Sequence, residues 1–481
     1  MDEIQNVIDL CTKAFCLVKP WDVLISLAES HLRENKNLAS IKYAEAALKM
    51  QPDSLRARVV LCSAYERFSG MGKMIFDCAK AGLEIDPGHI DLLLRAGHAK
   101  LSMMELQEAS VYFQRALAEN PDNISAILGL FETSHTLGDL NQSGSLLEKA
   151  LSLNPTNPWA SNAKAIFLKD LGKYSESFAL AKKLVEEHPN IRLFKFNLSS
   201  HYLLQGDLRK GFELYEYRPT NSWERMFLDL PCARLWKGEE LEGKSIFLWS
   251  DQGDGDTIQF MRYIPLFSAY KCKVFLKIPD RMHGLFQHLK VYLVQENEKL
   301  PAHDFQLSLS SLPALFKTKL AIIPPPVSFP KTLQPIKGRI GIVWRGNPNY
   351  KWDKKRSIDL EFLTPLFQIE GVKYIALQKE INEKEIRFLD KHGILRPKLE
   401  TWEDTAQNLQ FCERVICVDT AIAHLAGSMG ISTSILISLN PDWRWMLDRE
   451  DSPWYASIRL FRQRIPFNWK EPIEEIVRSF A

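Results

Sequence analysis

The sequence of 481 residues lacks several features that would narrow its class at once. It has no excess of one charge, because 61 Lys and Arg balance 59 Asp and Glu to a formal net charge of +2. This balance argues against a nucleic-acid-binding surface and against electrostatic attachment to a membrane. No apolar run is long enough to span a bilayer, and the first residues lack a basic stretch followed by an apolar core. We therefore expect neither export nor a membrane span.

Paired cysteines are also missing. The eight cysteines form no CxxC motif, and several lie within apolar helix or strand patterns. This distribution is typical of reduced, buried thiols, so we expect a cytoplasmic protein. The composition is otherwise that of an ordinary globular chain, with 46% hydrophobic residues. A chain of this length is expected to form about three domains.

A repeat occupies the first half of the chain. Prolines recur there at intervals of 35, 34, 34 and 34 residues, a period typical of tetratricopeptide helix pairs. Residues 191–217 show one further helix-pair pattern that would cap the array. We therefore predict an α-solenoid over residues 1–218. The recurring prolines are Pro52, Pro87, Pro121, Pro155 and Pro189.

The first helix of each pair lines the concave face of such a solenoid. Each candidate residue on that face is, taken alone, equally typical of solvated helix surface. The array as a whole favours a peptide or protein ligand, because solenoids offer an extended groove. By repeat position, the residues expected to face the groove and contact an acceptor are His98, Glu132, His135 and Asn162.

The second half alternates strand and helix patterns, which predicts parallel sheets. A proline-rich stretch at 322–330 indicates a linker between two domains. We predict a linker and a first Rossmann-like domain at 219–326, and a second Rossmann-like domain at 327–481. The expected strands are 245–249, 274–278, 339–343, 374–377, 414–418 and 433–438.

Two strand-to-helix turns are candidate binding sites. Residues 246–250 lead into DQGDGDTIQF at 251–260, and 414–417 lead into VDTAIAHLAG at 418–427. A strand that opens into a small-residue helix presents backbone N–H groups and a positive helix end, which suit a phosphate or diphosphate. Two such units indicate two halves that face a cleft.

Three groups of motifs together resemble a bacterial family in which tetratricopeptide repeats precede a glycosyltransferase domain of the GT-B type. That family is related to the ADP-heptose transferases and more distantly to O-GlcNAc transferase. The resemblance covers nearly the whole chain. Its motifs are WKG at 236–238 and LEGK at 241–244 before 252–263, IVWRGNPNY at 342–350 with KRSI at 355–358, and 418–427 with PDWRWMLDR at 441–449 and DSPWY at 451–455.

The resemblance implies an inverting, metal-independent glycosyltransferase that needs no cofactor other than its nucleotide-sugar donor. The implied acceptor is a Ser or Thr hydroxyl of a protein in the repeat groove, such as flagellin or another surface protein. One alternative is a cell-envelope glycan or lipid-linked acceptor. Another is a scaffold whose transferase domain is inactive, although the intact Asp256, His424 and glycine loops argue against decay.

Glycosyl transfer needs a base for the acceptor proton and groups that carry the charge of the departing phosphate. Asp256 matches the aspartate that serves as base in related heptosyltransferases, although it could instead only cap its helix. The formal DxD of Asp254 and Asp256 would suit a metal in another glycosyltransferase fold, but here it lies in a glycine turn, so we expect no metal ligand.

The donor is expected to contact both turns and the basic loop between them. Arg356 aligns with a lysine that contacts the donor phosphate in heptosyltransferases, while Arg345 stands where the family has a small residue. His424 is a donor contact or a packed histidine. The aromatic residues around Arg444 favour core packing. The expected donor-binding residues are Gly253, Gly255, Arg345, Arg356, Gln378, Asp419, Thr420 and His424.

Overall fold

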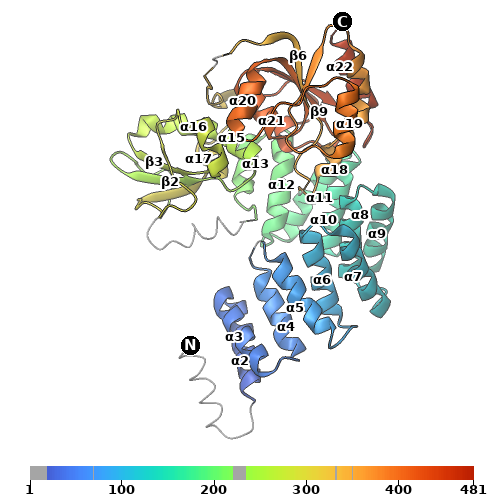
Figure 1. The fold of residues 1–481 in the computed structure, drawn as a ribbon. Helices are drawn as coiled ribbons and strands as arrows, with labels where there is room; N and C mark the ends of the chain where they lie inside the picture. The colour runs from blue at the N-terminus through green and yellow to red at the C-terminus, as the bar shows by residue number, and fades with distance from the viewer. Residues whose placement is uncertain (1–18, 69, 220–233, 331–332, 349, 481) are drawn as a thin grey trace. The chain divides into compact units, whose positions relative to one another are not determined.

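The computed structural model describes residues 19–68, 70–219, 234–330, 333–348 and 350–480. These residues fall into two compact units, one up to Lys164 and one from Ala165 onward. Figure 1 shows the helices and strands of both units. Within the described ranges, no helix combines the length and the apolar character that crossing a bilayer requires.

The described part of the repeat region forms six helix pairs. Its second helices end two to four residues before the recurring prolines, as the period predicts, because proline cannot continue a helix. A tetratricopeptide solenoid is thus confirmed. Its helices are α2 (Pro20–Arg33), α3 (Asn37–Met50), α4 (Leu55–Tyr65), α5 (Gly72–Leu83), α6 (Ile90–Ser102), α7 (Leu106–Glu119), α8 (Ile124–Thr136), α9 (Leu140–Leu153), α10 (Pro158–Asp170), α11 (Tyr174–Glu187), α12 (Arg192–Leu204) and α13 (Leu208–Tyr215).

Close helix approach in the first unit depends on glycine beside one aromatic ring. Phe113 of α7 is fully buried, and a Cβ on Gly97 or Gly129 would lie 2.6 or 2.4 Å from its ring. Both glycines must therefore stay without a side chain for α6 and α8 to close on α7.

The second unit contains two parallel sheets of five strands each. In the first, the strand order is β1-β5-β2-β3-β4. The chain adds β3 and β4 on one side of β2 and then returns to place β5 on the other side. This sheet consists of β1 (Arg234–Leu235), β2 (Ser245–Trp249), β3 (Lys273–Lys277), β4 (Tyr292–Leu293) and β5 (Phe305–Ser308).

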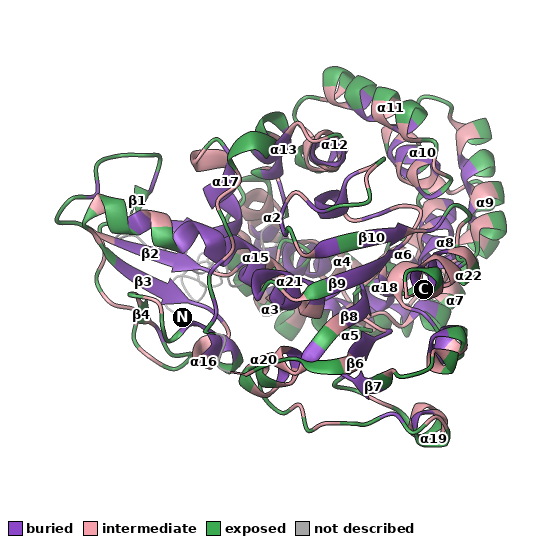
Figure 2. Ribbon diagram, turned by 90° about the horizontal axis from the view of Figure 1, so that it is seen from above, coloured by how far each residue is buried: buried purple, intermediate pink, exposed green. Residues whose placement is uncertain are grey.

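The second sheet has the order β10-β9-β8-β6-β7, and its direction of growth reverses between β6 and β8. Figure 2 shows the central strands of both sheets buried. Its strands are β6 (Ile336–Val343), β7 (Lys373–Ala376), β8 (Cys412–Val418), β9 (Ser432–Ile437) and β10 (Ile458–Arg462).

The six strands predicted from the sequence are confirmed to within a few residues, and four further strands are found. Two of these, β1 and β4, have only two residues each, and two of the five residues of β10 are arginines. The linker expected at the start of 219–326 lies against the first sheet at its described end, since β1 pairs with Phe305 and Gln306 of β5 and Trp236 is buried. Residues 220–233 lie outside the described ranges.

Helices cover the sheets, and the last repeat helices pack on them. Phe212 of α13 lies 5.4 Å from Trp443, between ring centroids, and α12 packs on the 3-10 turn η6 (Trp443–Trp445). The compact-unit boundary at Lys164 therefore differs from the expected domain boundary at 218. The covering helices are α15 (Asp254–Phe260), α16 (His283–Phe286), α17 (Leu312–Leu315), α18 (Asp353–Arg356), α19 (Glu383–Lys391), α20 (Trp402–Gln410), α21 (Ala421–Ser428) and α22 (Lys470–Arg478).

Candidate functional site

The two turns singled out by the sequence lie at equivalent places in the two sheets. One joins β2 to α15, and the other joins β8 to α21. Both are at the carboxyl ends of parallel strands, beside the point where the strand order reverses. Open parallel sheets form their ligand crevices at such points.

The two turns also contact each other. Gly255 of α15 approaches α21 so closely that a Cβ would lie 2.9 Å from His424 Cδ2 and 3.3 Å from Ala421 Cα. A residue without a side chain is therefore required where the two helices meet. Through this contact, Asp256 in the half with the first sheet lies near Thr420 in the half with the second sheet.

Asp256 is held at both carboxylate oxygens. Its Oδ2 accepts a hydrogen bond of 3.0 Å from Gly253 N, and its Oδ1 forms an ion pair with Arg444 Nη2. The first bond caps the helix, the alternative role weighed above. Desolvation raises the pKa of Asp256, and the Arg444 charge opposes that rise. About a quarter of the side chain stays exposed, so a ligand hydroxyl can reach it.

Thr420 occupies the N-cap position of α21 without bonding its helix. The side chain of Thr401, the N-cap of α20, accepts a hydrogen bond of 3.0 Å from Asp404 N. In contrast, Thr420 Oγ1 is buried and has no hydrogen-bond partner among the described residues. A helix start leaves backbone N–H groups without intrahelical partners, so this end of α21 can accept an anion.

His424 is packed among aromatic rings. Its Nδ1 lies 3.0 Å from the Tyr455 hydroxyl, and its ring stacks on Trp445 at 5.4 Å between centroids. Burial, together with nearby arginines, lowers the pKa of His424 well below its usual value. The imidazole is therefore neutral at physiological pH. These contacts favour the packing alternative, and donor contact remains a prediction.

Arg356 of α18 and Asp419, which follows β8, interact electrostatically. Arg356 Nε donates to Asp353 Oδ1 at 3.0 Å, and its guanidinium lies 4.5 Å from the Tyr350 ring centroid. Burial opposes the charge of Arg356, but Asp419 and Asp353 outweigh it and raise the pKa. Burial, with Asp442, raises the pKa of Asp419 to about 6. The crevice therefore holds a firmly charged cation beside a weakly acidic carboxyl.

Arg345 does not join that crevice as an unpaired cation. Its Nη2 forms an ion pair of 2.9 Å with Glu385 of α19 and donates to Glu380 O at 2.8 Å. Gln378 Oε1 accepts from Arg345 N at 3.1 Å, so these two residues lie together. The expectation that Arg345 meets a phosphate is weakened, since Glu385 already neutralises its charge.

The two aspartates of the DxD pattern bond different partners. Asp254 pairs with Arg281 at 2.6 Å and accepts from Trp402 Nε1 at 3.1 Å, whereas Asp256 bonds Arg444. Among the residues that the structure describes, no group of three or more His, Cys, Asp or Glu is arranged to hold a metal ion. Asp254 instead links Arg281, which precedes α16, to Trp402 of α20.

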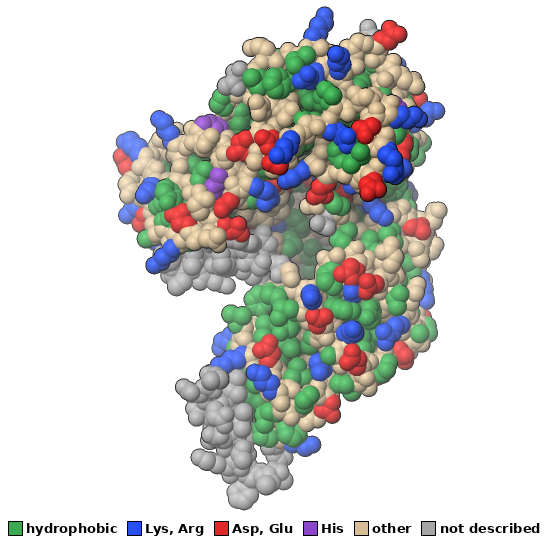
Figure 3. Space-filling model, in the orientation of Figure 1, with side chains coloured by type: hydrophobic (Ala, Val, Ile, Leu, Met, Phe, Trp, Pro, Cys, Tyr) green, Lys and Arg blue, Asp and Glu red, His purple; other side chains and the backbone are tan. Residues whose placement is uncertain are grey.

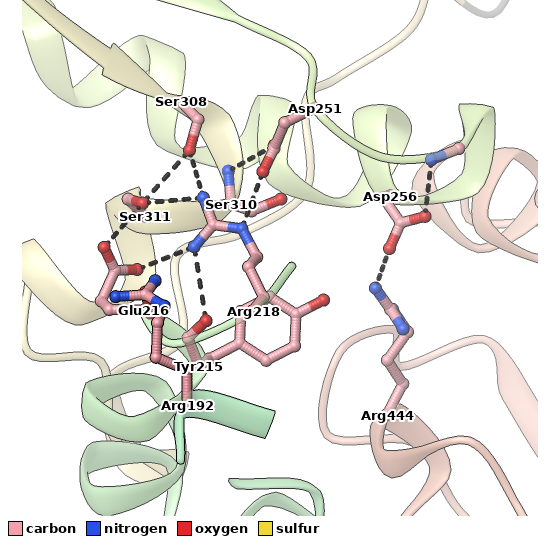
Figure 4. A network of polar contacts seen from close by, with 11 residues as sticks. Arg192, Tyr215, Glu216, Arg218, Asp251, Asp256, Ser308, Ser310, Ser311 and Arg444 are labelled. Carbon is pink, nitrogen blue, oxygen red and sulfur yellow. Dashed lines mark hydrogen bonds and ion pairs between the residues drawn. The ribbon is translucent and has the colours of Figure 1, made fainter. Parts of the chain in front are cut away.

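An arginine that no sequence pattern indicated lies at the reversal point of the first sheet. Arg218, which follows α13, donates from Nε to Asp251 Oδ2 at 2.8 Å and from Nη2 to Ser308 Oγ at 2.6 Å and Ser311 Oγ at 3.1 Å (Figure 4). Both Arg218 and Asp251 are buried. The crevice of the first sheet is thus filled by the chain itself. No local pattern signals a contact between residues so distant in sequence.

The end of the repeat array also contacts the second sheet. Asp170 pairs with Lys355 and accepts from Asn440 Nδ2 at 2.5 Å, and the Tyr174 hydroxyl donates to Leu439 O. Lys355 belongs to the same short helix as Arg356.

The four predicted groove residues differ in exposure. His98 is exposed and Glu132 partly exposed, whereas His135 and Asn162 are buried, His135 stacking on Phe131 at 5.1 Å between ring centroids. Figure 3 shows hydrophobic side chains among acidic and basic ones over the repeat helices. His98 and Glu132 are thus the better placed of the four for a ligand on the surface.

The comparisons with known proteins support the repeats. The family model of the tetratricopeptide repeat matches residues 146–179, from α9 to α11. The chain resembles Protein FlbA of Caulobacter vibrioides, with 24% identity over 411 residues, 74% of this chain and 66% of FlbA. It also resembles Superkiller protein 3 of Saccharomyces cerevisiae, with 31% identity over 102 residues, 21% of this chain and 7% of that protein. The chain spans less than two thirds of the length of these curated relatives.

Two solved structures are similar to part of the chain. A tetratricopeptide protein of Thermus thermophilus is 20% identical, with a TM-score of 0.35 over 38% of this chain and 99% of that one. A tetratricopeptide repeat protein of Parabacteroides merdae is 18% identical, with a TM-score of 0.33 over 42% of this chain and 81% of that one. The helix pairs and the family match define a tetratricopeptide protein-interaction scaffold that continues into two parallel sheets.

Proposed function

We propose that this chain is a glycosyltransferase of the GT-B type, with the repeat array presenting the acceptor. It would move a sugar from a nucleotide-activated donor to a Ser or Thr hydroxyl of a protein, such as flagellin or another surface protein, with inversion and without a metal. The observation that carries the proposal is the contact of Gly255 with His424. This contact supports the proposal because it packs α15, which carries the Asp256 carboxylate, against α21, whose start would receive the donor phosphate.

The proposed reaction is a single displacement. The acceptor oxygen bonds the anomeric carbon as the bond from that carbon to the donor phosphate breaks, and the electron pair leaves with the nucleotide. The hydroxyl proton passes to Asp256, whose exposed quarter allows access. The helix start at Thr420 and the Arg356 guanidinium receive the charge of the departing phosphate. Base and leaving group lie on opposite sides of the sugar in this arrangement, which gives inversion.

Two alternative functions share part of this proposal. The acceptor could be a cell-envelope glycan or lipid-linked sugar, or the sheets could be inactive and the repeats alone bind partners. The family match within the repeats favours a binding role for the array in every case. Intact-mass analysis of a co-expressed protein acceptor separates a protein acceptor from a glycan acceptor.

The deciding experiment is a two-step nucleotide assay. A thermal-shift screen of the diphosphates of uridine, guanosine, adenosine and cytidine, and of CMP, identifies the base, because a ligand at a hundred times its Kd stabilises by about 2.7 kcal/mol. Release of that nucleotide from its commercially available sugar conjugates is then measured for the wild type and Asp256→Asn. We expect near-normal nucleotide binding and a loss of release of about 10²-fold or more in the variant. Absence of both binding and release in the wild type would favour the scaffold.

A further inference from the structure

Arg444 is buried where the two halves of the second unit meet. Its side chain is 7% exposed. It belongs to η6, in the half that contains the second sheet, whereas its partners Asp256 and Gln259 belong to α15 in the other half. The two halves must therefore be in contact for these bonds to form.

All three nitrogens of the Arg444 guanidinium have carboxylate or amide partners. Nη2 bonds Asp256 Oδ1, Nε donates to Gln259 Oε1, and Nη1 donates to Asp442 Oδ1 at 2.8 Å. The guanidinium also lies 4.2 Å from the Trp443 ring centroid. A planar group fixed at three nitrogens holds its partners in one orientation, which a lysine cannot reproduce.

We propose that Arg444 is a positioning residue that orients the Asp256 carboxylate and keeps it ionised when the two halves meet. This inference rests on the proposed function, in which Asp256 accepts the acceptor proton. Asp256 would then be oriented as a base only while the two halves are in contact. Separation of the halves would break its bond with Arg444. A donor that binds the half carrying Arg444 would thereby affect Asp256, which lies in the other half.

The charge around Asp256 supports this role. Desolvation and two carboxylates favour the protonated form of Asp256, and Arg444 is the cation that opposes them most. Since Oδ2 accepts from Gly253 N and Oδ1 faces Arg444, the carboxylate cannot rotate without losing a bond. The titratable or charged groups that face it are Arg444 and Asp442 from the η6 segment, Asp251 after β2, Tyr215 of α13, Tyr350 after β6, and His424 of α21 across Gly255.

The test is the pH profile of nucleotide release from the sugar conjugate found by the nucleotide assay. Removing the Arg444 charge raises the pKa of Asp256, so a larger fraction is protonated and unable to act as a base near neutral pH. In Arg444→Gln we expect the acidic limb of kcat/KM to move upward by about one to three pH units. Arg444→Lys keeps the positive charge but loses the planar guanidinium. It should shift the acidic limb of kcat/KM less than Arg444→Gln does, while still lowering kcat.

Arg449→Gln is the matched control, because Arg449 lies in the same segment but pairs with the exposed Asp451. It should leave the acidic limb in place. If Arg444→Gln lowers kcat/KM by the same factor at every pH and leaves the acidic limb in place, Arg444 is only a packing residue and the proposal is overturned. An unchanged profile in a variant that folds as well as the wild type also overturns it.

A second measurement separates this inference from the proposed function. If the wild type releases no nucleotide, the proposed function fails, but the pairing can still be measured from urea midpoints of Arg444→Gln, Asp256→Asn and the double variant. Non-additive midpoints at pH 8 that become additive at pH 4 support an ionised, oriented Asp256. Additive midpoints at both pH values overturn it.

Discussion

Arg218 Nε donates to Asp251 Oδ2 at 2.8 Å, and both side chains are withdrawn from solvent. The pair joins the end of the repeat array to the loop after β2, 33 residues further along the chain. Nη2 donates to Ser308 and Ser311, and Nη1 donates to Tyr215 O and Glu216 Oε1, so every guanidinium nitrogen is bonded at the reversal point of the first sheet (Figure 4). The chain that follows α13 is thereby fixed to the sheet that carries the proposed base.

Breaking this pair should be costly. Arg218→Met leaves Asp251 buried without its cation, and loss of one partner of a buried pair costs about 3–5 kcal/mol. Arg209→Met is the control on α13, since Arg209 and Glu213 are both exposed and such a pair contributes about 0.5 kcal/mol at most. Urea unfolding measures both. Equal midpoints in the two variants would contradict the role of Arg218.

Gly255→Ala tests the contact between α15 and α21. The new Cβ would meet the packed His424 ring and the Ala421 backbone, and overpacking of this kind costs about 1–3 kcal/mol. Gly253→Ala is the control, because its Cβ would meet only Asp256 Oδ2 at 3.3 Å, in an extended backbone. Denaturant midpoints should fall clearly in the first variant and little in the second. The reverse order would show that the helices do not depend on this glycine.

The repeats and the central strands could be predicted from the sequence, because each leaves a regular pattern along the chain. The prolines mark the ends of helix pairs, and apolar runs such as residues 414–418 mark buried strands. The strand β5, with Gln306 at its centre, lacked that pattern and was missed. The contacts that assemble the candidate site were also out of reach. Arg444 and Asp256 lie 188 residues apart, and only the packing of two sheets brings them together.

Arg356 is expected to contact the donor phosphate. Lys354, in the same short helix, carries the same charge and provides the control. Arg356→Gln should reduce the thermal shift given by a saturating nucleotide diphosphate, because it removes the cation beside the helix start at Thr420. Lys354→Gln, in the same short helix but exposed, should not. The expected loss of affinity for Arg356→Gln is about tenfold or more, the effect of a charge-assisted hydrogen bond. Equal shifts in both variants would remove Arg356 from the donor site.

Chelation should leave transfer intact, since the phosphate charge is assigned to Arg356 and the start of α21. Nucleotide release is measured after dialysis against EDTA and again after addition of Mn²⁺. Activity that disappears with the chelator and returns with Mn²⁺ would revive the metal interpretation of Asp254 and Asp256, whose present partners are Arg281, Trp402 and Arg444.

Asp419 should make stability depend on pH in the direction opposite to that of most carboxylates. Burial raises the pKa of Asp419 from 3.8 to about 6, so the folded state holds this proton more tightly than the unfolded chain does. Between those values the folded state binds more protons, and the stability due to Asp419 falls as the pH rises from about 4 through 6. Asparagine cannot ionise, so Asp419→Asn should gain melting temperature relative to the wild type across this range.

The control for Asp419 is Asp404→Asn on α20. Hydrogen bonds from Thr401 lower the pKa of Asp404, so its contribution is present above about pH 4 and lost only below that. The difference between this variant and the wild type should therefore stay constant from pH 5 to pH 8, whereas the Asp419→Asn difference should rise and level off above pH 7. Parallel melting curves for Asp419→Asn and the wild type would mean that Asp419 is ionised throughout.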